Sequence, residues 1–243
     1  MEESKDNGGA SGGDIIEVTQ VLQKLLTKQS AMNQDSNCSL ITTLTNNILT
    51  TNTYLFSSIV GWNEIPENQQ RYNTSSNILS VTELSGFSLA NTSTSSNVIE
   101  TPTNCRFYTF NSSTINMEAS NVEKSNVNQS ICHYFEMSSI CIAKSAIEII
   151  GGNTIIQVAV EYAINSTANI FPSNNNSKHS EITFGNRKIV EEGQMVPATD
   201  FGLNDHLIGL TLNNGINIST NQEEPVTVTF HHIDQHVKIL CIR

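Results

Sequence analysis

Charged residues are scarce in this chain of 243 residues, and positively charged residues are the scarcest. Asp, Glu, Lys and Arg make up 14% of the sequence, with 12 Lys and Arg against 23 Asp and Glu, for a formal net charge of −11. A protein that binds nucleic acid needs a positive surface to displace the counterions of the phosphates. The composition therefore excludes nucleic acid as a partner and argues against a long coiled coil.

Several motifs of known chemistry are also absent. The sequence contains no Gly-rich nucleotide-binding motif, no G-x-S-x-G elbow and no C-x-x-C pair. His232 and His236 have an H-x-x-x-H spacing, which suits a metal site on a helix. They follow the alternating segment Val226–Phe230, so we predict a strand end, with His231 and His232 on opposite faces. We therefore expect no metal, no cofactor and no catalytic residue. A Ser-His-Asp triad assembled only in the fold stays an open alternative.

Long apolar runs are missing too. Residues 1–13 are acidic and Gly-rich without an apolar centre, so they predict a flexible tail and not a signal peptide. No run approaches the roughly 20 apolar residues that a membrane helix requires. These features fit either a soluble intracellular protein or an internal piece of a longer chain.

Neutral polar residues take the place of charge. The chain has 30 Asn, 28 Ser and 24 Thr, a composition that suits an extracellular surface and also a compositional bias of the source. Eight positions fit the N-glycosylation pattern, where chance alone gives roughly six. These glycosylation candidates are Asn37, Asn73, Asn91, Asn111, Asn128, Asn165, Asn175 and Asn217.

The five cysteines are disulfide candidates: Cys38, Cys105, Cys132, Cys141 and Cys241. Cys132 and Cys141 are near enough in sequence to staple a local loop. The pairing among the first four is open, since four cysteines allow three pairings. Buried unpaired thiols are the alternative for some of them. An odd count leaves one thiol over, and we interpret Cys241 as having a partner beyond the end of the chain.

Helical periodicity dominates the first third of the chain. A capping pattern at Asp14 and apolar spacing predict a helix over 14–28. A second helix is expected from about residue 35 to a break at Gly61-Trp62, with Trp62 as a core anchor, or alternatively a ligand platform. A third is expected from about Pro66 to Ala90. The polar segment Asn91–Asn97 then predicts a subdomain boundary. We therefore divide the chain into a tail (1–13), a helical subdomain (14–93) and a strand subdomain (94–243).

The second part shows short apolar runs between turn signals, which is typical of a β-sandwich. In Ile155–Ile164 the residues Ile156, Val158, Val160 and Tyr162 share one face, and Gln157 and Glu161 share the other. A helical turn is expected at Lys144–Ile150. Strands are expected at Cys105–Phe110, Ser139–Ile142, Ile155–Ile164, Glu181–Phe184, His206–Leu212, Val226–Ile233 and Val237–Cys241. Helices followed by strands predict an α+β fold: a helical subdomain and then an antiparallel β-sandwich.

Several of these segments together resemble the GAIN domain of adhesion G-protein-coupled receptors. Glu224–Ile233, followed by Cys241, is similar to the family's Pro-Val strand that leads to the first cysteine of the proteolysis-site motif. The other matching segments occur in the family's order, and the resemblance covers roughly residues 14–243. They are Asn47–Trp62, Ile78–Ala90, Ile140–Ile150, Ile155–Ile170 and Ile208–Leu212.

The resemblance implies a glycosylated, disulfide-bonded module on the extracellular side of the plasma membrane, in a receptor for signal transduction. Family members cleave themselves at a His-Leu-Thr or His-Leu-Ser tripeptide and retain the cleaved strand as a tethered agonist. The sequence to Arg243 contains no such tripeptide, so we expect no self-cleavage. The implied partners are a tethered strand and a seven-helix membrane domain, both missing from this chain, and protein ligands. The alternatives are a stand-alone extracellular adhesive or ligand-binding sandwich, or the same domain in a polycystin-like membrane protein.

Overall fold

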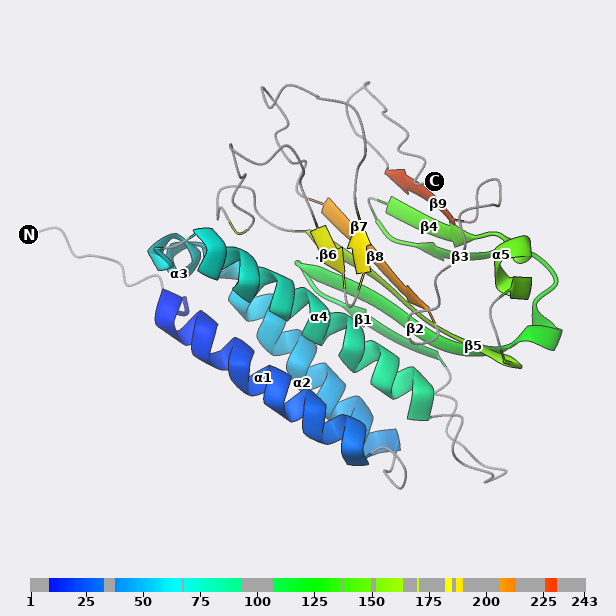
Figure 1. Cartoon of the computed structure of the whole chain (residues 1–243), viewed down its shortest axis with the longest axis horizontal. Helices are drawn as coiled ribbons and strands as arrows, with labels where there is room; N and C mark the ends of the chain where they lie inside the picture. Colours follow the sequence, from blue (N-terminus) through cyan, green and yellow to red (C-terminus); the bar gives the residue numbers. More distant parts are fainter. Residues whose placement is uncertain are drawn as a thin grey trace, which may run out of the picture.

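The fold was obtained as a computed structural model of the whole chain. The residues that the structure describes are 9–32, 38–66, 68–92, 107–136, 138–149, 152–163, 170, 182–184, 187–189, 206–212 and 226–230. Within them, four helices come first and antiparallel strands follow (Figure 1). The predicted α+β class, with a helical part and a strand part, is confirmed.

The helical part consists of α1 (Gly12–Met32), α2 (Cys38–Ser57), α3 (Ile59–Glu64) and α4 (Asn68–Thr92). Helix α4 packs against both α1 and α2, and α1 also contacts α3. The three long helices share an apolar cluster in which Leu22, Leu26, Ile48 and Val81 are buried. The third predicted helix is confirmed to within two residues at each end.

Helix α1 starts at a different residue from the one predicted. Ser11 is the N-cap: its hydroxyl accepts a hydrogen bond from the Asp14 N–H at 3.2 Å. The Asp14 carboxylate accepts in return from the Ser11 hydroxyl at 2.7 Å and from its N–H at 3.0 Å. These hydrogen bonds lower the pKa of Asp14. The capping box is therefore real but shifted, because Asp14 holds its third helical position and not its N-cap.

The break in the second helix also differs from the prediction. It falls at Ser58, and Gly61 and Trp62 lie inside α3. The Ser58 hydroxyl donates to the Tyr54 carbonyl at 2.9 Å and accepts from the Ala10 N–H at 3.1 Å. A hydroxyl that bonds backbone groups in this way competes with the regular helical pattern. Trp62 is the predicted core anchor: it is fully buried, and its indole N–H donates to the Leu55 carbonyl at 2.8 Å.

Among the described residues, the strands form three antiparallel sheets. The first, sheet A, has the strand order β1-β2-β5-β8, the second, sheet B, has the order β3-β4-β9, and β6 pairs with β7. A short helix α5 (Lys144–Ile149) follows β4. The strands are β1 (Phe107–Asn111), β2 (Ile115–Glu123), β3 (Ile131–Tyr134), β4 (Ser138–Ile142), β5 (Thr154–Ala163), β6 (Ile182–Phe184), β7 (Arg187–Ile189), β8 (His206–Leu212) and β9 (Val226–Phe230).

The helices, sheet A and sheet B form three successive layers (Figure 1). The face of sheet A toward the helices is apolar, and Ile115, Met117, Val158, Val160 and Tyr162 on it are fully buried. Helix α4 approaches this face closely at Gly86. A Cβ there would meet the Met117 sulfur at 2.7 Å and a Val158 methyl at 3.0 Å. One core therefore extends across the helices and the sheet.

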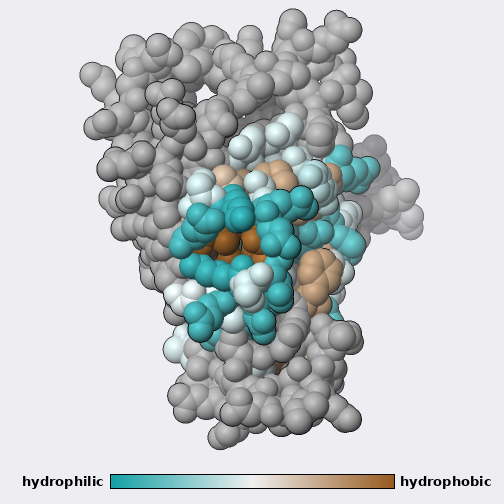
Figure 2. Space-filling model, turned by 90° about the vertical axis from the view of Figure 1, so that its right-hand side faces the viewer, coloured by the Kyte–Doolittle hydropathy of each residue, from teal (hydrophilic) through white to brown (hydrophobic). Residues whose placement is uncertain are grey.

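A smaller apolar cluster closes the end of the molecule where α5 lies. Ala146 and Ile147 of α5 pack there with Ile142, Ile155 and Leu212. Figure 2 looks onto this end and shows a recess of hydrophobic residues within a hydrophilic rim. The helical turn predicted at Lys144–Ile150 is thus confirmed as α5.

The predicted strands at Ser139, Ile155 and His206 are confirmed within one residue. Strands β2, β3 and β7 were not predicted. Residues 105–106 and 231–243 lie outside the described part of the chain, and with them the segment Val237–Cys241. None of the helices in the described ranges has the length and hydropathy of a membrane span.

Candidate functional site

A cluster of buried polar side chains lies between the two main sheets. On β2, the alternation that points Ile115 and Met117 toward the helices points the even-numbered residues toward sheet B. Register places Asn116 opposite Glu161 and Ser120 opposite Gln157 of β5. The face of β5 that contains Gln157 and Glu161 was predicted correctly. It does not face solvent, however, because Gln157 and Glu161 are only 2% and 1% exposed.

Glu161 ties the two sheets together. Its carboxylate accepts a hydrogen bond from the Ser138 hydroxyl of β4 at 2.6 Å. It accepts a second from the Asn116 side-chain amide of β2 at 3.2 Å. A buried carboxylate is stable only when its oxygens are hydrogen-bonded, since burial removes its hydration. Glu161 therefore fixes where sheet B sits on sheet A.

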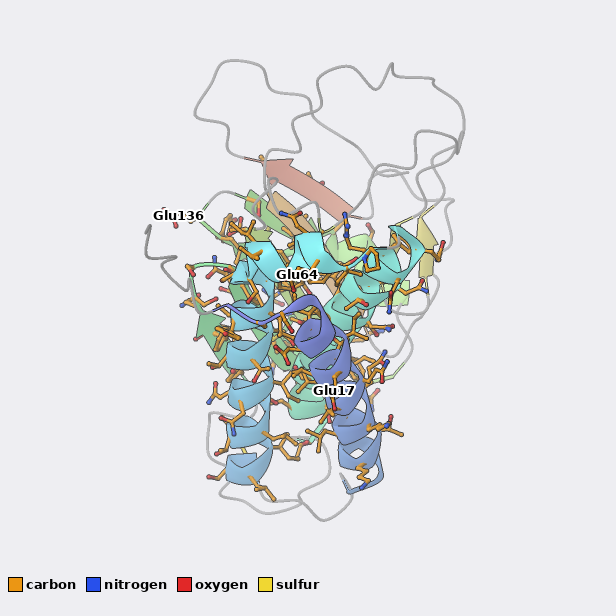
Figure 3. The ribbon with its side chains drawn as sticks, turned by 90° about the vertical axis from the view of Figure 1, so that its left-hand side faces the viewer. Glu17, Glu64 and Glu136 are labelled. Carbon is orange, nitrogen blue, oxygen red and sulfur yellow. A yellow bond between two sulfur atoms is a disulfide. The ribbon has the colours of Figure 1, made fainter. Side chains whose placement is uncertain are left out.

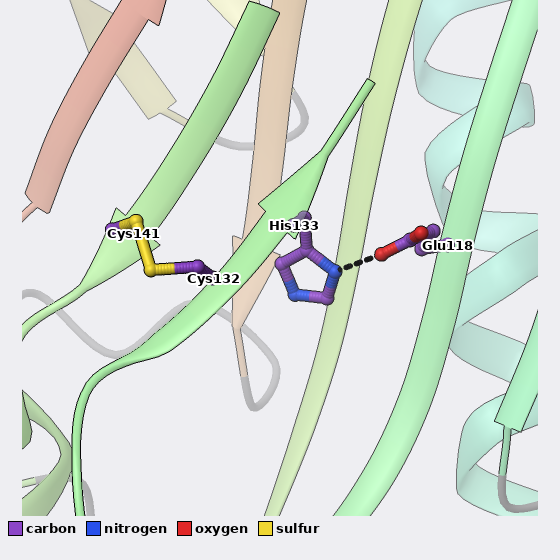
Figure 4. Close-up of a disulfide and its surroundings, with 4 residues drawn as sticks. All are labelled: Glu118, Cys132, His133 and Cys141. Atoms are coloured by element: carbon purple, nitrogen blue, oxygen red, sulfur yellow. Dashed lines mark hydrogen bonds and ion pairs between the residues drawn. A yellow bond between two sulfur atoms is a disulfide. The ribbon is translucent and has the colours of Figure 1, made fainter. Parts of the chain in front are cut away.

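A second polar link joins β3 to β2. His133 Nδ1 lies 2.7 Å from a carboxylate oxygen of Glu118 (Figure 4). The carboxylate can only accept, so Nδ1 carries the proton and donates it. His133 is 3% exposed, and its Nε2 has no hydrogen-bond partner in the described part of the molecule. The Gln157 side-chain oxygen is in the same situation, although its amide donates to the Ser120 hydroxyl at 2.8 Å.

A groove runs over this second link. It has a volume of about 580 Å³, and its described lining includes Glu118, His133 and Gln157, together with the exposed residues Phe107 and Tyr134. A second hollow of about 390 Å³ shares Glu118 and Tyr134 with the first. The two hollows are therefore neighbours that share these two residues.

A disulfide holds the strand that carries His133. Cys132 of β3 and Cys141 of β4 face each other in register and are joined, with a Cα–Cα distance of 4.1 Å. Because neighbouring residues on a strand point to opposite faces, the disulfide lies on the outer face of sheet B and His133 on the inner one. Figure 4 shows both features on the same short strand. The bond fixes β3 against β4.

The remaining cysteines fall into two groups. Cys38 also takes part in a disulfide. Cys105 and Cys241 lie outside the described residues, so the pairing proposed for Cys241 stays a prediction.

Four glycosylation candidates can be placed. Asn73 and Asn91 lie on α4, Asn111 ends β1, and Asn128 lies between β2 and β3. All four side chains are exposed, as attachment of a glycan requires. Asn37, Asn165, Asn175 and Asn217 lie outside the described residues, as do His231, His232 and His236.

A tyrosine links the helices to the sheet. The Tyr108 hydroxyl donates to the Asn46 side-chain oxygen at 2.6 Å, and burial raises the pKa of Tyr108 to about 12. Burial also raises the pKa of Tyr162, with a smaller contribution from the charge of Glu83.

The inter-sheet cluster consists of hydrogen-bonding side chains beside a groove. In the described ranges no three His, Cys, Asp or Glu side chains come together as a metal site. Among the described residues, no hydroxyl or thiol forms a hydrogen bond with His133 Nε2, as the nucleophile of a Ser-His or Cys-His pair would. What the cluster does offer is hydrogen-bond acceptors at the base of a groove. Glu118 and His133 were both missed from the sequence, although the alternating apolar residues of β2 were a usable signal.

Comparison with known proteins assigns no family. No protein-family model matches the chain, and no curated protein matches it in sequence. Among solved structures, the full extracellular region of zebrafish Gpr126/Adgrg6 resembles it with a TM-score of 0.42 and 8% sequence identity. The match covers 93% of this chain but only 29% of that structure. A similarity of this size fixes neither a family nor a function.

Proposed function

We propose that this chain is an extracellular GAIN-like module of an adhesion G-protein-coupled receptor, on the outer side of the plasma membrane. The observation that carries the proposal is the place of β9. Val226–Phe230 resembles the family's Pro-Val strand, and it pairs antiparallel with β4, in register from Ser138–Phe230 to Ile142–Val226. The order of helices before strands supports the same proposal. In this role the sandwich scaffolds the strand segment that follows β9.

The molecular role we propose is retention, not catalysis. A sandwich holds a strand through backbone hydrogen bonds and pockets for alternate side chains. The chain contains no His-Leu-Thr or His-Leu-Ser, so we propose that it does not cleave itself. Purified chain incubated at pH 7 should give one intact band on a denaturing gel. Two fragments that appear with time would contradict this part of the proposal.

The decisive test of the receptor assignment is the transcript beyond the Arg243 codon. We expect a Trp, further cysteines, the cleavage tripeptide and seven apolar spans of roughly 20 residues each. A different number of spans after the same domain would indicate a polycystin-like protein. A stop codon directly after Arg243, with a stable secreted product, would overturn the receptor assignment.

A test of the extracellular location is glycosylation. After expression through the secretory pathway of a eukaryotic cell, the chain should lose mass when an N-glycosidase is added. Replacing Asn73, Asn91, Asn111 and Asn128 by Gln should reduce that loss, because these side chains are exposed. A chain that carries no glycan under these conditions would count against the extracellular assignment.

A stand-alone extracellular ligand-binding protein is the second candidate. The groove over Glu118 and His133 favours it, because a built recess with unpartnered buried polar atoms is a feature of binding sites. The transcript separates the two candidates, since only the receptor requires membrane spans.

A further inference from the structure

The groove between β2 and β3 has the chemistry of a site for one kind of side chain. We propose that it binds a basic side chain, best an arginine, from a partner protein. The proposal rests on the acceptors at the base of the groove, the aromatic rings at its mouth and the sign of its charge. It stands whether or not the chain belongs to a receptor, because it uses only the residues of the groove.

The base of the groove is rich in acceptors. Glu118 holds His133 with one carboxylate oxygen and is itself 25% exposed, so a ligand can reach its carboxylate. With the Nδ1 proton donated to Glu118, Nε2 is an acceptor in the neutral form of the His133 ring. The Gln157 oxygen is a further acceptor, and both it and Nε2 are buried without partners among the described residues. Unsatisfied buried acceptors need donors, which an internal water or a ligand that reaches them supplies.

The mouth of the groove suits a planar cation. Phe107 is 56% exposed and Tyr134 is 70% exposed, and both line the same groove as Glu118. Exposed aromatic faces attract guanidinium and ammonium groups. A guanidinium also carries five N–H donors in a fixed plane, which matches several acceptors at once. A neutral sugar would use the rings and donate hydroxyl hydrogen bonds to the carboxylate, but it would lack the attraction between opposite charges.

The charge around the groove has the required sign. The second hollow adds the exposed Glu136 beyond Glu118, and neither hollow has a Lys or Arg in its described lining. Figure 3 places Glu136 at the margin of the molecule, apart from Glu17 and Glu64 on the helices. The whole chain carries a formal net charge of −11, which attracts basic partners over distance.

A charge-matched pair of peptides tests the proposal on the intact chain. The probes are acetyl-Gly-Arg-Gly-amide and the same peptide with citrulline, which keeps the shape of arginine without its charge. Binding is followed by the amide shifts of the isotope-labelled chain. We expect saturable shifts at Phe107, Glu118 and Tyr134, and about tenfold tighter binding of the arginine peptide, because its hydrogen bonds are charge-assisted.

Two substitutions on one strand separate the groove from general attraction. Glu118→Gln keeps an acceptor for the His133 N–H and removes the charge, and should weaken the arginine peptide about tenfold. Glu123→Gln removes the same charge from an exposed site on β2 outside both hollows, and should leave binding unchanged. Tyr134→Ala should weaken binding while the amide spectrum stays folded, because the ring is mostly exposed.

Three outcomes would overturn the proposal. The first is equal binding of the arginine and citrulline peptides. The second is an equal effect of Glu118→Gln and Glu123→Gln, which would show attraction to overall charge alone. The third is tighter binding of a neutral methyl pyranoside than of the arginine peptide, which would make the groove a sugar site.

Discussion

The two faces of sheet A are both buried, but the face toward sheet B adds buried polar side chains to a small apolar cluster. Toward the helices, Met117, Val158 and Val160 meet apolar side chains and are fully buried. Toward sheet B, Glu161 and Gln157 of the same strand are almost equally buried and meet polar groups. Apolar packing is non-directional, whereas buried hydrogen bonds stabilise a structure only in one geometry. The face of sheet A toward the helices therefore supplies most of the stability. The face toward sheet B fixes the relative position of the two sheets.

The largest loss of stability is expected from a substitution between the helices and sheet A. Phe56 of α2 is 1% exposed and packs edge-on against Tyr162 of β5, with ring centroids 6.0 Å apart. Phe56→Ala should lower the free energy of unfolding by about 3–5 kcal/mol, because it leaves a cavity. Urea unfolding measures the change. Leu40→Ala on the same helix is the control, since Leu40 is 59% exposed and its loss should stay within about 0.5 kcal/mol.

The next largest effect is expected from the disulfide of sheet B. Cys132→Ser with Cys141→Ser should cost about 2–3 kcal/mol, since a short loop is no longer closed in the unfolded chain. Urea unfolding under oxidising conditions measures it. Either single substitution should cost as much as the pair, because either one removes the bond. A double variant as stable as the wild type would mean that hydrogen bonds alone hold β3 to β4.

Removing a Glu161 hydrogen bond should lower the free energy of unfolding by less than loss of the disulfide does. It affects one defined contact between the two sheets. Glu161→Gln removes one hydrogen bond of a charged group and should cost about 2 kcal/mol. Glu123→Gln, at an exposed position on β2, is the matched control. The combination of Glu161→Leu with Ser138→Ala sharpens the comparison. If it is as stable as the wild type, the buried polar link serves geometry and not stability.

The smallest effect is expected for a polar contact within the apolar face. Tyr108→Phe removes the hydrogen bond to Asn46 and should cost about 1 kcal/mol near neutral pH. The pKa of Tyr108 rises from 10.0 to about 12 on folding, so the folded state holds its proton longer than the unfolded state. The wild type should lose stability relative to Tyr108→Phe as the pH rises from 10 toward 12. A stability difference that is constant over that pH range would contradict a raised pKa of Tyr108 in the folded state.

Much of the fold follows from local patterns in the sequence. The faces of β5, the bounds of β8 and the extent of α4 all follow from apolar spacing, because local residues decide them. Strand β2 was missed despite its alternation. Its polar positions Asn116, Glu118 and Ser120 made it resemble a loop, and they are partly or fully buried because sheet B covers them. The break at Ser58 was missed because a side-chain hydrogen bond produces it, not a glycine.

The candidate site was not predictable in the same way. Glu118 and His133 are 15 residues apart on strands of different sheets, and only the stacking of those sheets brings them within 2.7 Å. The histidines near residue 231 are the more conspicuous signal in the sequence, because they are clustered. A lone His133 beside a cysteine carries no comparable signal.

The disulfide between β3 and β4 also has a mechanical consequence. A pull on the chain after β9 acts first on β4, its antiparallel neighbour. Hydrogen bonds between strands yield under tension, but the covalent bond from Cys141 to Cys132 does not, so β3 stays attached to β4 and takes part of the load. There it reaches the contact between His133 and Glu118. A hairpin that cannot open in this way transmits force to the groove without losing its own shape.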